Sequence, residues 1–382
     1  MRKISLILSL LLMYVIFFFD SYVFELSQEY FSNGFLLNVI RGAAVLFFLL
    51  SLPKVRLNIL ASFFIIYIFM YILSSYYFTQ NIETSNYYFY NFIFGVLLFC
   101  VLSEAINRIG YYYIIRLFLI MSIIFTIISL LIEFIPISRY ITDYNKGLFI
   151  CGQSWNIRKC GATNNPNALG MIGFVIFIYL IHYGDRYKDK FYYLACSCIL
   201  IIALLSLSRS FILAVIIYML IITMFSSISS KLKLFLLSIV LFFLVLYLNP
   251  DVLDRFTLNS LSSGSGRSTI FKSAFEYIAS SPVFGNGLNF NRDYNLNGIS
   301  WVGLIDNAYL NVFVSYGVVG LMLFLSLFGA LYLKIKTHIN KVVILSSIMF
   351  VFFVEDFFIK TYFMWMVLPL LLNDDGNNKY DS

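Results

Sequence analysis

Residues 112–134 read YYIIRLFLIMSIIFTIISLLIEF, an apolar run that holds a single arginine and a single glutamate. A helix needs about 20 mainly apolar residues to cross roughly 30 Å of hydrocarbon, and this run is long enough. Its apolar residues follow one another without the alternation of a barrel strand, so only a helix would satisfy its backbone polar groups inside a bilayer. The run therefore predicts a membrane-spanning helix.

Runs of this kind recur to the end of the chain. The composition agrees with them, because 61% of the 382 residues are hydrophobic and 12% are charged, whereas a soluble domain has about a quarter charged residues. We predict an all-α polytopic membrane protein, with residues 1–382 as a single integral membrane domain in the lipid bilayer. The twelve predicted spanning helices cover residues 4–22, 35–52, 57–76, 88–107, 112–134, 167–183, 190–207, 210–226, 232–248, 308–333, 340–355 and 357–372.

The N-terminus begins like a secretory signal peptide. Met1, Arg2 and Lys3 precede an apolar run that ends at Phe19. No small-x-small cleavage site follows this run, which passes directly into Asp20. We therefore expect a first transmembrane helix that is retained.

The charges in the loops predict the orientation of the helices, because cytoplasmic loops carry an excess of lysine and arginine. With a cytoplasmic N-terminus, the short outer loops at 23–34 and 77–87 contain acidic residues and no basic ones. We therefore expect both termini to be cytoplasmic, and we attribute the net charge of +7 to this bias rather than to a nucleic-acid partner. The basic residues of the predicted cytoplasmic loops are Lys54, Arg56, Arg108, Arg186, Lys188, Lys190, Lys231, Lys233, Lys334, Lys336 and Lys341.

Two long outer loops depart from this charge pattern. They cover residues 135–166 and 249–307, and long loops are exempt from the orientation rule. Loops of this length inside a compact protein are usually functional, which favours a functional role over a linker. Their basic residues are Arg139, Lys146, Arg158 and Lys159 in the first loop, and Arg255, Arg267, Lys272 and Arg292 in the second.

The first of these loops contains two cysteines in the segment CGQSWNIRKC. If the loop faces an oxidising compartment, a disulfide between Cys151 and Cys160 would close it. Two free thiols are the alternative. The remaining cysteines lie in predicted helices and are expected to be small core residues.

Arg209 lies in LLSLSRSFILA, between two predicted helices at their outer end. An arginine so close to hydrocarbon is costly unless it is paired, and its guanidinium suits a bidentate grip on phosphate. A snorkelling anchor is the alternative. Arg41, inside a predicted helix, either reaches the same cavity or snorkels. Glu133, at the outer end of another, is either the partner of Arg41 or a separate catalytic candidate.

The second long loop contains SSGSGRSTIFKSAFEYIASSPVFGNGLNF, residues 262–290. Apolar residues at helical spacing predict a short amphipathic helix over 267–279, which begins at Arg267. The serines and proline that follow stop this helix, and the glycines beyond them predict a tight turn. An arginine at a helix N-terminus, beside free backbone N–H groups, suits an anionic oxygen.

Asp306 stands where this loop meets the helix predicted at 308–333. Asp306 and Asn307 both suit a helix N-cap, and taken locally this interpretation is favoured over a catalytic role. The alternative is a carboxylate at the membrane edge that takes a proton from an attacking hydroxyl. The outer loops contain no D-x-D sequence and no His/Cys cluster, so we expect neither a metal nor a cofactor.

Four segments together resemble the O-antigen polymerase/O-antigen ligase superfamily of bacterial envelope glycosyltransferases. LSLSRS is similar to the serine–arginine turn of that family, and GRSTIFKSAFEYIASSPVFGNGL to its arginine-led loop helix with a Pro-x-x-Gly-x-Gly turn. DNAYLNVFVSYGVVGL is similar to its His-Asn-x-x-Leu helix start, and NNPNALG, Asn164 to Gly170, to an element that leads into a helix. The motifs cover roughly residues 150–330, and their order and spacing are more specific than any one of them.

The resemblance implies a GT-C-like membrane fold in the bacterial inner membrane, with the two long loops in the periplasm. It also implies an undecaprenyl-pyrophosphate-linked oligosaccharide as donor, attacked by a glycan hydroxyl of the acceptor, and a chain-length regulator as a candidate partner. We expect Arg209 and Arg267 on the pyrophosphate and Asp306 as base or acceptor-orienting group. Further candidates for substrate binding are Arg158, Arg292, Arg41, Asn167, Asn307 and Tyr309.

One departure separates the branches of this superfamily. Its ligase branch usually carries histidine where this chain has Asp306, and the two histidines of this chain, His182 and His338, lie on the predicted cytoplasmic side. This favours a polymerase of O-antigen repeat units in lipopolysaccharide biosynthesis. The alternatives are an O-antigen ligase, a lipid-linked oligosaccharide flippase or other transporter, and a non-catalytic scaffold.

Overall fold

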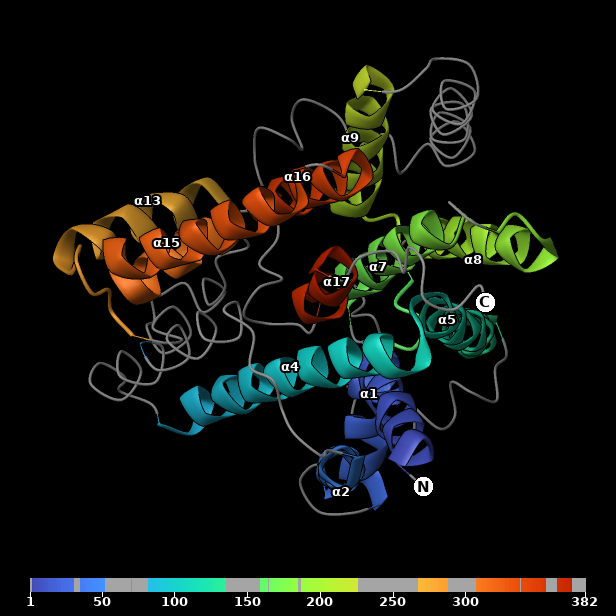
Figure 1. Ribbon diagram of the computed structural model, residues 1–382. Coiled ribbons are helices and arrows are strands. Elements are labelled where there is room, and N and C mark those ends of the chain that lie inside the picture. The colour runs from blue at the N-terminus through green and yellow to red at the C-terminus, as the bar shows by residue number, and fades with distance from the viewer. Residues whose placement is uncertain are drawn as a thin grey trace. The chain divides into compact units, whose positions relative to one another are not determined.

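The computed structural model describes residues 2–30, 35–51, 70, 82–134, 159–163, 165–184, 187–225, 267–287, 307–336, 338–354 and 363–372. Throughout these ranges the regular structure is helical (Figure 1). Ten of the twelve predicted segments contain a helix, whereas 57–76 and 232–248 lie outside the described residues apart from Met70. The helices are α1 (Arg2–Tyr30), α2 (Phe35–Ser51), α4 (Ile82–Ile109), α5 (Tyr111–Phe134), α7 (Pro166–Gly184), α8 (Lys190–Ser206), α9 (Arg209–Phe225), α13 (Arg267–Ser280), α15 (Ala308–Ile335), α16 (Ile339–Val354) and α17 (Phe363–Leu372).

Four of the described helices are long and apolar enough to cross a membrane. They lie in α1, α5, α7 and α15, over Lys3–Asp20, Tyr111–Phe134, Pro166–Gly184 and Ala308–Ile335. Shorter apolar helices accompany them in α2, α8, α9, α16 and α17. The chain is therefore a helical, multi-pass membrane protein.

The first helix differs from its prediction. It was expected to end at residue 22, but α1 continues to Tyr30 with a kink at Phe19, where φ is −125° and ψ is 15°. The predicted outer loop at 23–34 is thus helical up to Tyr30. The sequence from Asp20 to Tyr30 contains neither glycine nor proline, so nothing in it stops the helix where the apolar run ends.

The described helices belong to two compact units, which we treat separately. The first combines residues 1–54, 97–217 and 365–382. Its core is aromatic: Phe118 of α5 contacts Phe18 of α1, at 5.1 Å between ring centroids, and stacks on Tyr179 of α7 at 3.7 Å. The Tyr179 hydroxyl in turn donates to the Met366 carbonyl of α17, at 2.9 Å.

Polar contacts fix α1 and α2 against each other within this unit. Ser9 Oγ donates to the Ala44 carbonyl at 2.7 Å, and Arg41 Nη2 donates to Asp20 Oδ1 at 3.3 Å. The Arg41 and Asp20 side chains keep 15% and 27% of their surface exposed. The arginine inside α2 thus has a carboxylate partner on α1.

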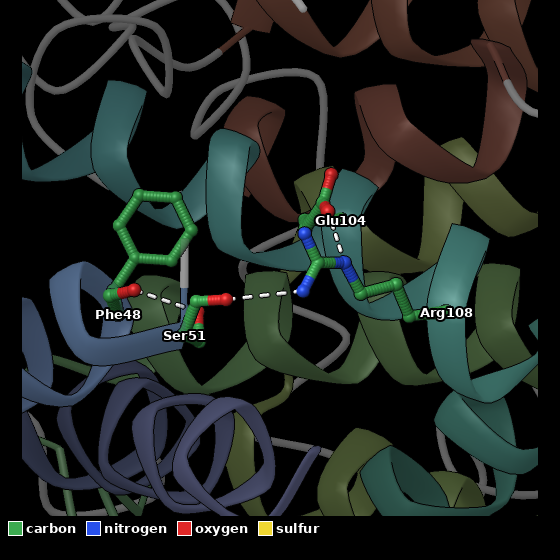
Figure 2. A network of polar contacts seen from close by, with 4 residues as sticks. All are labelled: Phe48, Ser51, Glu104 and Arg108. Atoms are coloured by element: carbon green, nitrogen blue, oxygen red, sulfur yellow. Dashed lines mark hydrogen bonds and ion pairs between the residues drawn. The ribbon is translucent and has the colours of Figure 1, made fainter. Parts of the chain in front are cut away.

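A second polar network joins the C-terminal ends of α2 and α4 (Figure 2). Arg108 pairs with Glu104 one turn earlier, and its Nη1 donates to the Ser51 carbonyl at 3.0 Å. Arg108 therefore satisfies a carbonyl that the end of α2 leaves without a helical partner.

At the start of α8, Asp189 accepts from the Tyr192 N–H at 2.9 Å, and this hydrogen bond lowers the pKa of Asp189.

The second unit combines residues 55–96 and 218–364. In it α13 packs along α15 through Ala274, Ile278 and Val314, and α15 also packs on α16. Figure 1 shows α13 lying beside α15. All of the described part of the second long loop therefore rests on the helix that follows it.

The pairing of Asp20 with Arg41 predicts a coupled effect on stability. Asp20→Leu and Arg41→Leu each remove one partner of this ion pair, and each should lower the free energy of unfolding by roughly 1–3 kcal/mol, less than for a fully buried pair. The double substitution should cost less than the sum of the two. Thermal unfolding of the purified protein in detergent measures this, and strictly additive losses would contradict the pairing.

Candidate functional site

The serine–arginine turn joins α8 to α9 with only Leu207 and Ser208 between the two helices. Leu207 adopts a left-handed conformation with φ 43° and ψ 38°, and its N–H donates to the Ala203 carbonyl at 3.0 Å. The Ser208 carbonyl accepts from the Ile212 N–H at 3.0 Å, which begins α9. Arg209 is thus the first residue of α9, beside backbone N–H groups that a helix leaves free.

The NNPNALG element packs directly against this turn. Asn165 Oδ1 accepts from the Asn167 N–H at 2.8 Å, and Pro166 is the first residue of α7, where a missing N–H costs nothing. A Cβ at Gly170 would lie 2.4 Å from the Ser208 Cβ. Two of the four family-like segments are therefore in contact in the first unit, and Gly170 is required for their approach.

Residues 159–163 form a third part of this cluster. Glu133, near the end of α5, accepts from the N–H groups of Cys160 and Gly161 at 3.1 and 3.0 Å. Its other carboxylate oxygen lies 3.8 Å from Lys159 Nζ. The N–H of Lys159 then donates to the Leu205 carbonyl at 2.8 Å, in the last turn of α8. The sequence left open whether Glu133 pairs with Arg41; in the structure Glu133 pairs with Lys159, and Arg41 pairs with Asp20.

Cys160 belongs to the same segment and is disulfide-bonded. The three other cysteines that the structure describes, Cys100, Cys196 and Cys198, are free thiols inside helices. Cys151, the partner that we propose for Cys160, lies outside the described residues.

In the second unit, the turn after α13 docks into a break in α15. At Gly317 the helix is interrupted, with φ 63° and ψ −164°. The turn supplies donors and acceptors to this break through four backbone hydrogen bonds. These are Asn286 N–H to Val314 O at 2.8 Å, Gly287 N–H to Ser315 O at 2.9 Å, Val318 N–H to Pro282 O at 2.9 Å and Val319 N–H to Val283 O at 3.2 Å.

Two glycines allow this close contact of backbones. A Cβ at Gly285 would lie 2.4 Å from the backbone of Ser315, and a Cβ at Gly317 would lie 2.2 Å from the Val283 carbonyl oxygen. The Asn286 side chain adds donors to the Tyr277 carbonyl at 2.9 Å and the Val314 carbonyl at 3.2 Å. The contact therefore fixes the C-terminal end of α13 on α15. Sequence reasoning missed this role of Asn286, although the paired glycines of both motifs were a visible signal.

The start of α15 is capped by Asn307 rather than by Asp306. Asn307 Oδ1 accepts from the Leu310 N–H at 3.0 Å, and its Nδ2 donates to the Phe353 carbonyl at 3.1 Å. Tyr309 donates its hydroxyl to the Met349 carbonyl at 2.8 Å. Both side chains thus join α15 to α16. Since Asn307 fills the cap, that role is not left to Asp306, which lies outside the described residues.

The predicted site residues are therefore distributed over both units. Arg209 and Arg267 are each the first residue of a helix, α9 in the first unit and α13 in the second. Arg158 and Arg292, like Asp306, lie outside the described residues. Among the side chains that the structure describes, no group of three His, Cys, Asp or Glu residues gathers to hold a metal.

The break at Gly317 predicts a contrast between two glycines of the same helix. Gly317→Ala should lower the free energy of unfolding by more than about 2 kcal/mol, because this conformation is essentially restricted to glycine and the Cβ meets the Val283 carbonyl. Gly329→Ala, where a Cβ meets nothing within 4 Å, should be neutral or stabilising. Thermal unfolding in detergent measures both, and equal tolerance of the two changes would disprove the docked turn.

Comparison with known proteins gives a family match for part of the chain. No curated protein was found to match the chain. Residues 194–325 match the family model described as O-antigen ligase. This stretch includes the serine–arginine turn, α13 with the turn that follows it, and the start of α15. The match confirms, over residues 194–325, the predicted resemblance to the O-antigen polymerase/O-antigen ligase superfamily.

Proposed function

We propose that the chain is an O-antigen repeat-unit polymerase of the bacterial inner membrane. It would transfer a glycan from undecaprenyl pyrophosphate to a hydroxyl of another lipid-linked repeat unit, at the periplasmic face. The observation that carries the proposal is that Arg209 and Arg267 are each the first residue of a helix within the family-matched region. Free N–H groups and a guanidinium at one helix end form a strong site for phosphate oxygens.

The chemistry needs charge stabilisation more than it needs a cofactor. The acceptor hydroxyl attacks the anomeric carbon of the donor, and the bond from that carbon to the pyrophosphate oxygen breaks. The bonding electrons leave on the lipid pyrophosphate, whose growing negative charge Arg209 and Arg267 would stabilise. The hydroxyl proton would pass to the Asp306 carboxylate. Arg158 and Arg292 remain candidates for contacts to the pyrophosphate or the glycan.

Two facts support the assignment of the base to Asp306. The N-cap of α15 is Asn307, so Asn307 and not Asp306 has the capping role that was weighed against catalysis. Asp306 also stands where the ligase branch of the superfamily usually carries histidine. A carboxylate in this position favours the polymerase over an O-antigen ligase.

A transporter is the alternative from another class. It requires ionisable residues at mid-membrane that change partners during transport. Arg41, inside the apolar helix α2, is a candidate for such an ion, but it already pairs with Asp20 across two helices that pack closely. Purified protein that extends lipid-linked repeat units without an ion gradient would exclude a transport function.

Three substitutions test the proposed site in cells. Arg209→Ala, Arg267→Ala and Asp306→Ala should each reduce the polymer ladder at least a hundredfold, since removal of one transition-state donor costs about 10²–10³ in rate, and loss of a general base costs about 10²–10⁴. Lipopolysaccharide core bearing a single repeat should remain, because ligation would continue. Gel electrophoresis of lipopolysaccharide measures this, with Lys188→Ala in the α7–α8 loop as the control that keeps the ladder.

The same gel separates the alternatives. Core without any attached repeat would indicate a ligase. A full ladder from all three variants, with the protein present in the membrane, would show that these residues are not the site.

A further inference from the structure

Glu133 is a charged side chain near the end of a spanning helix that the proposed chemistry does not use. Its side chain is 11% exposed, and one of its oxygens accepts from two consecutive backbone N–H groups, those of Cys160 and Gly161. A carboxylate with two N–H donors and a nearby ammonium is well satisfied, and it is poorly placed to exchange protons with a substrate. These contacts favour a structural task for Glu133 over the catalytic one.

The segment that Glu133 holds is tied at several points. Ser129, one turn earlier in α5, accepts from the Ala162 N–H at 3.2 Å. Gly161 has φ +56°, and a Cβ there would lie 2.7 Å from the Ser129 side chain. Thr163 Oγ1 donates to the Cys160 carbonyl at 2.7 Å. Residues 159–163 are thus seated on the last turns of α5 in one defined conformation.

The same segment continues to the serine–arginine turn. The Lys159 ammonium lies 3.8 Å from a Glu133 carboxylate oxygen, and the Lys159 backbone N–H donates to the Leu205 carbonyl at 2.8 Å. Leu205 lies two residues before Leu207, whose left-handed conformation turns the chain into Arg209. Glu133 is therefore linked to Leu205, two residues before the left-handed residue, through its hydrogen bond from Cys160 and that of the adjacent Lys159 N–H.

We propose that Glu133 is a positioning residue for the donor site: it fixes residues 159–163 on α5 and, through the Lys159–Leu205 hydrogen bond, holds the turn that presents Arg209. The inference rests on the proposed function, because it assigns Arg209 to the pyrophosphate. Glu133 itself touches neither donor nor acceptor. What matters is its ability to accept two hydrogen bonds, and its negative charge is secondary.

Substitutions that separate hydrogen bonding from charge test this proposal. Glu133→Gln keeps an oxygen that accepts from both N–H groups and should retain activity within about threefold, since the Lys159 ion pair is long, at 3.8 Å, and partly open to solvent, so it contributes little. Glu133→Ala removes the acceptor and should lower kcat/KM on the order of ten- to hundredfold, as expected for a displaced catalytic group. Glu133→Asp keeps the charge but is one methylene too short, and it should resemble Glu133→Ala.

The assay uses the full-length protein, purified in detergent, with lipid-linked repeat units extracted from a strain that lacks it. Rates are compared per folded protein, so that a loss of stability alone leaves them unchanged. Glu104→Ala is the matched control, because Glu104 is also a half-buried, ion-paired carboxylate of the first unit and should stay within twofold of wild type.

A double-mutant cycle shows whether Glu133 acts through the arginine. In an Arg209→Lys background, whose donor contact is already weakened, Glu133→Ala should cost less than about threefold. Effects that simply multiply would overturn the proposal, and so would a Glu133→Gln variant as inactive as Glu133→Ala, which indicates proton transfer by Glu133. Failure of the wild-type protein to extend the repeat units would instead contradict the proposed function itself.

Discussion

The structure depends on one constraint: inside hydrocarbon, a backbone group that leaves a helix must find a partner within the protein. Within the described spanning helices, the interruption at Gly317 meets this condition through four hydrogen bonds from the turn after α13. At the helix ends the same need is met by Arg108 on the Ser51 carbonyl and by Asn307 on the Phe353 carbonyl. These departures from regular helix are therefore each completed by a second segment of the chain.

This constraint explains why the family-like segments occur as pairs. NNPNALG needs Gly170 so that the Ser208 turn can approach it, and the turn after α13 needs Gly285 so that α15 can approach it. In both units a glycine allows the chain to pack closely next to a helix that starts with arginine. The catalytic demand on such a site is fixed positive charge facing the leaving group, and preorganised backbone is what keeps that charge in place.

The sequence predicted the helices well, because apolar runs of about 20 residues leave few alternatives. It failed at the end of α1, where polar residues without glycine or proline continue the helix to Tyr30. The break at Gly317 was not foreseen, since glycine is common in membrane helices and its partner at Val283 lies 34 positions away along the chain.

The candidate site was predicted in part. The sequence singled out Arg209 and Arg267, and the structure makes each the first residue of a helix. The sequence also named Glu133 as a candidate residue. It did not predict the hydrogen bonds from Cys160 and Gly161, because these residues are distant in sequence and no local pattern links them to α5. Contacts of this kind follow from tertiary packing, and a single sequence contains no record of them.

The central claim is our proposal that Arg209 and Arg267 bind the pyrophosphate of the lipid-linked donor. An electron cryo-microscopy structure of the protein with a bound, non-transferable undecaprenyl-pyrophosphate analogue tests it most directly. We predict the pyrophosphate within hydrogen-bonding distance of both Arg209 and Arg267, at the N-terminal ends of α9 and α13. A pyrophosphate bound elsewhere, or the two arginines on opposite sides of the membrane, would contradict the account.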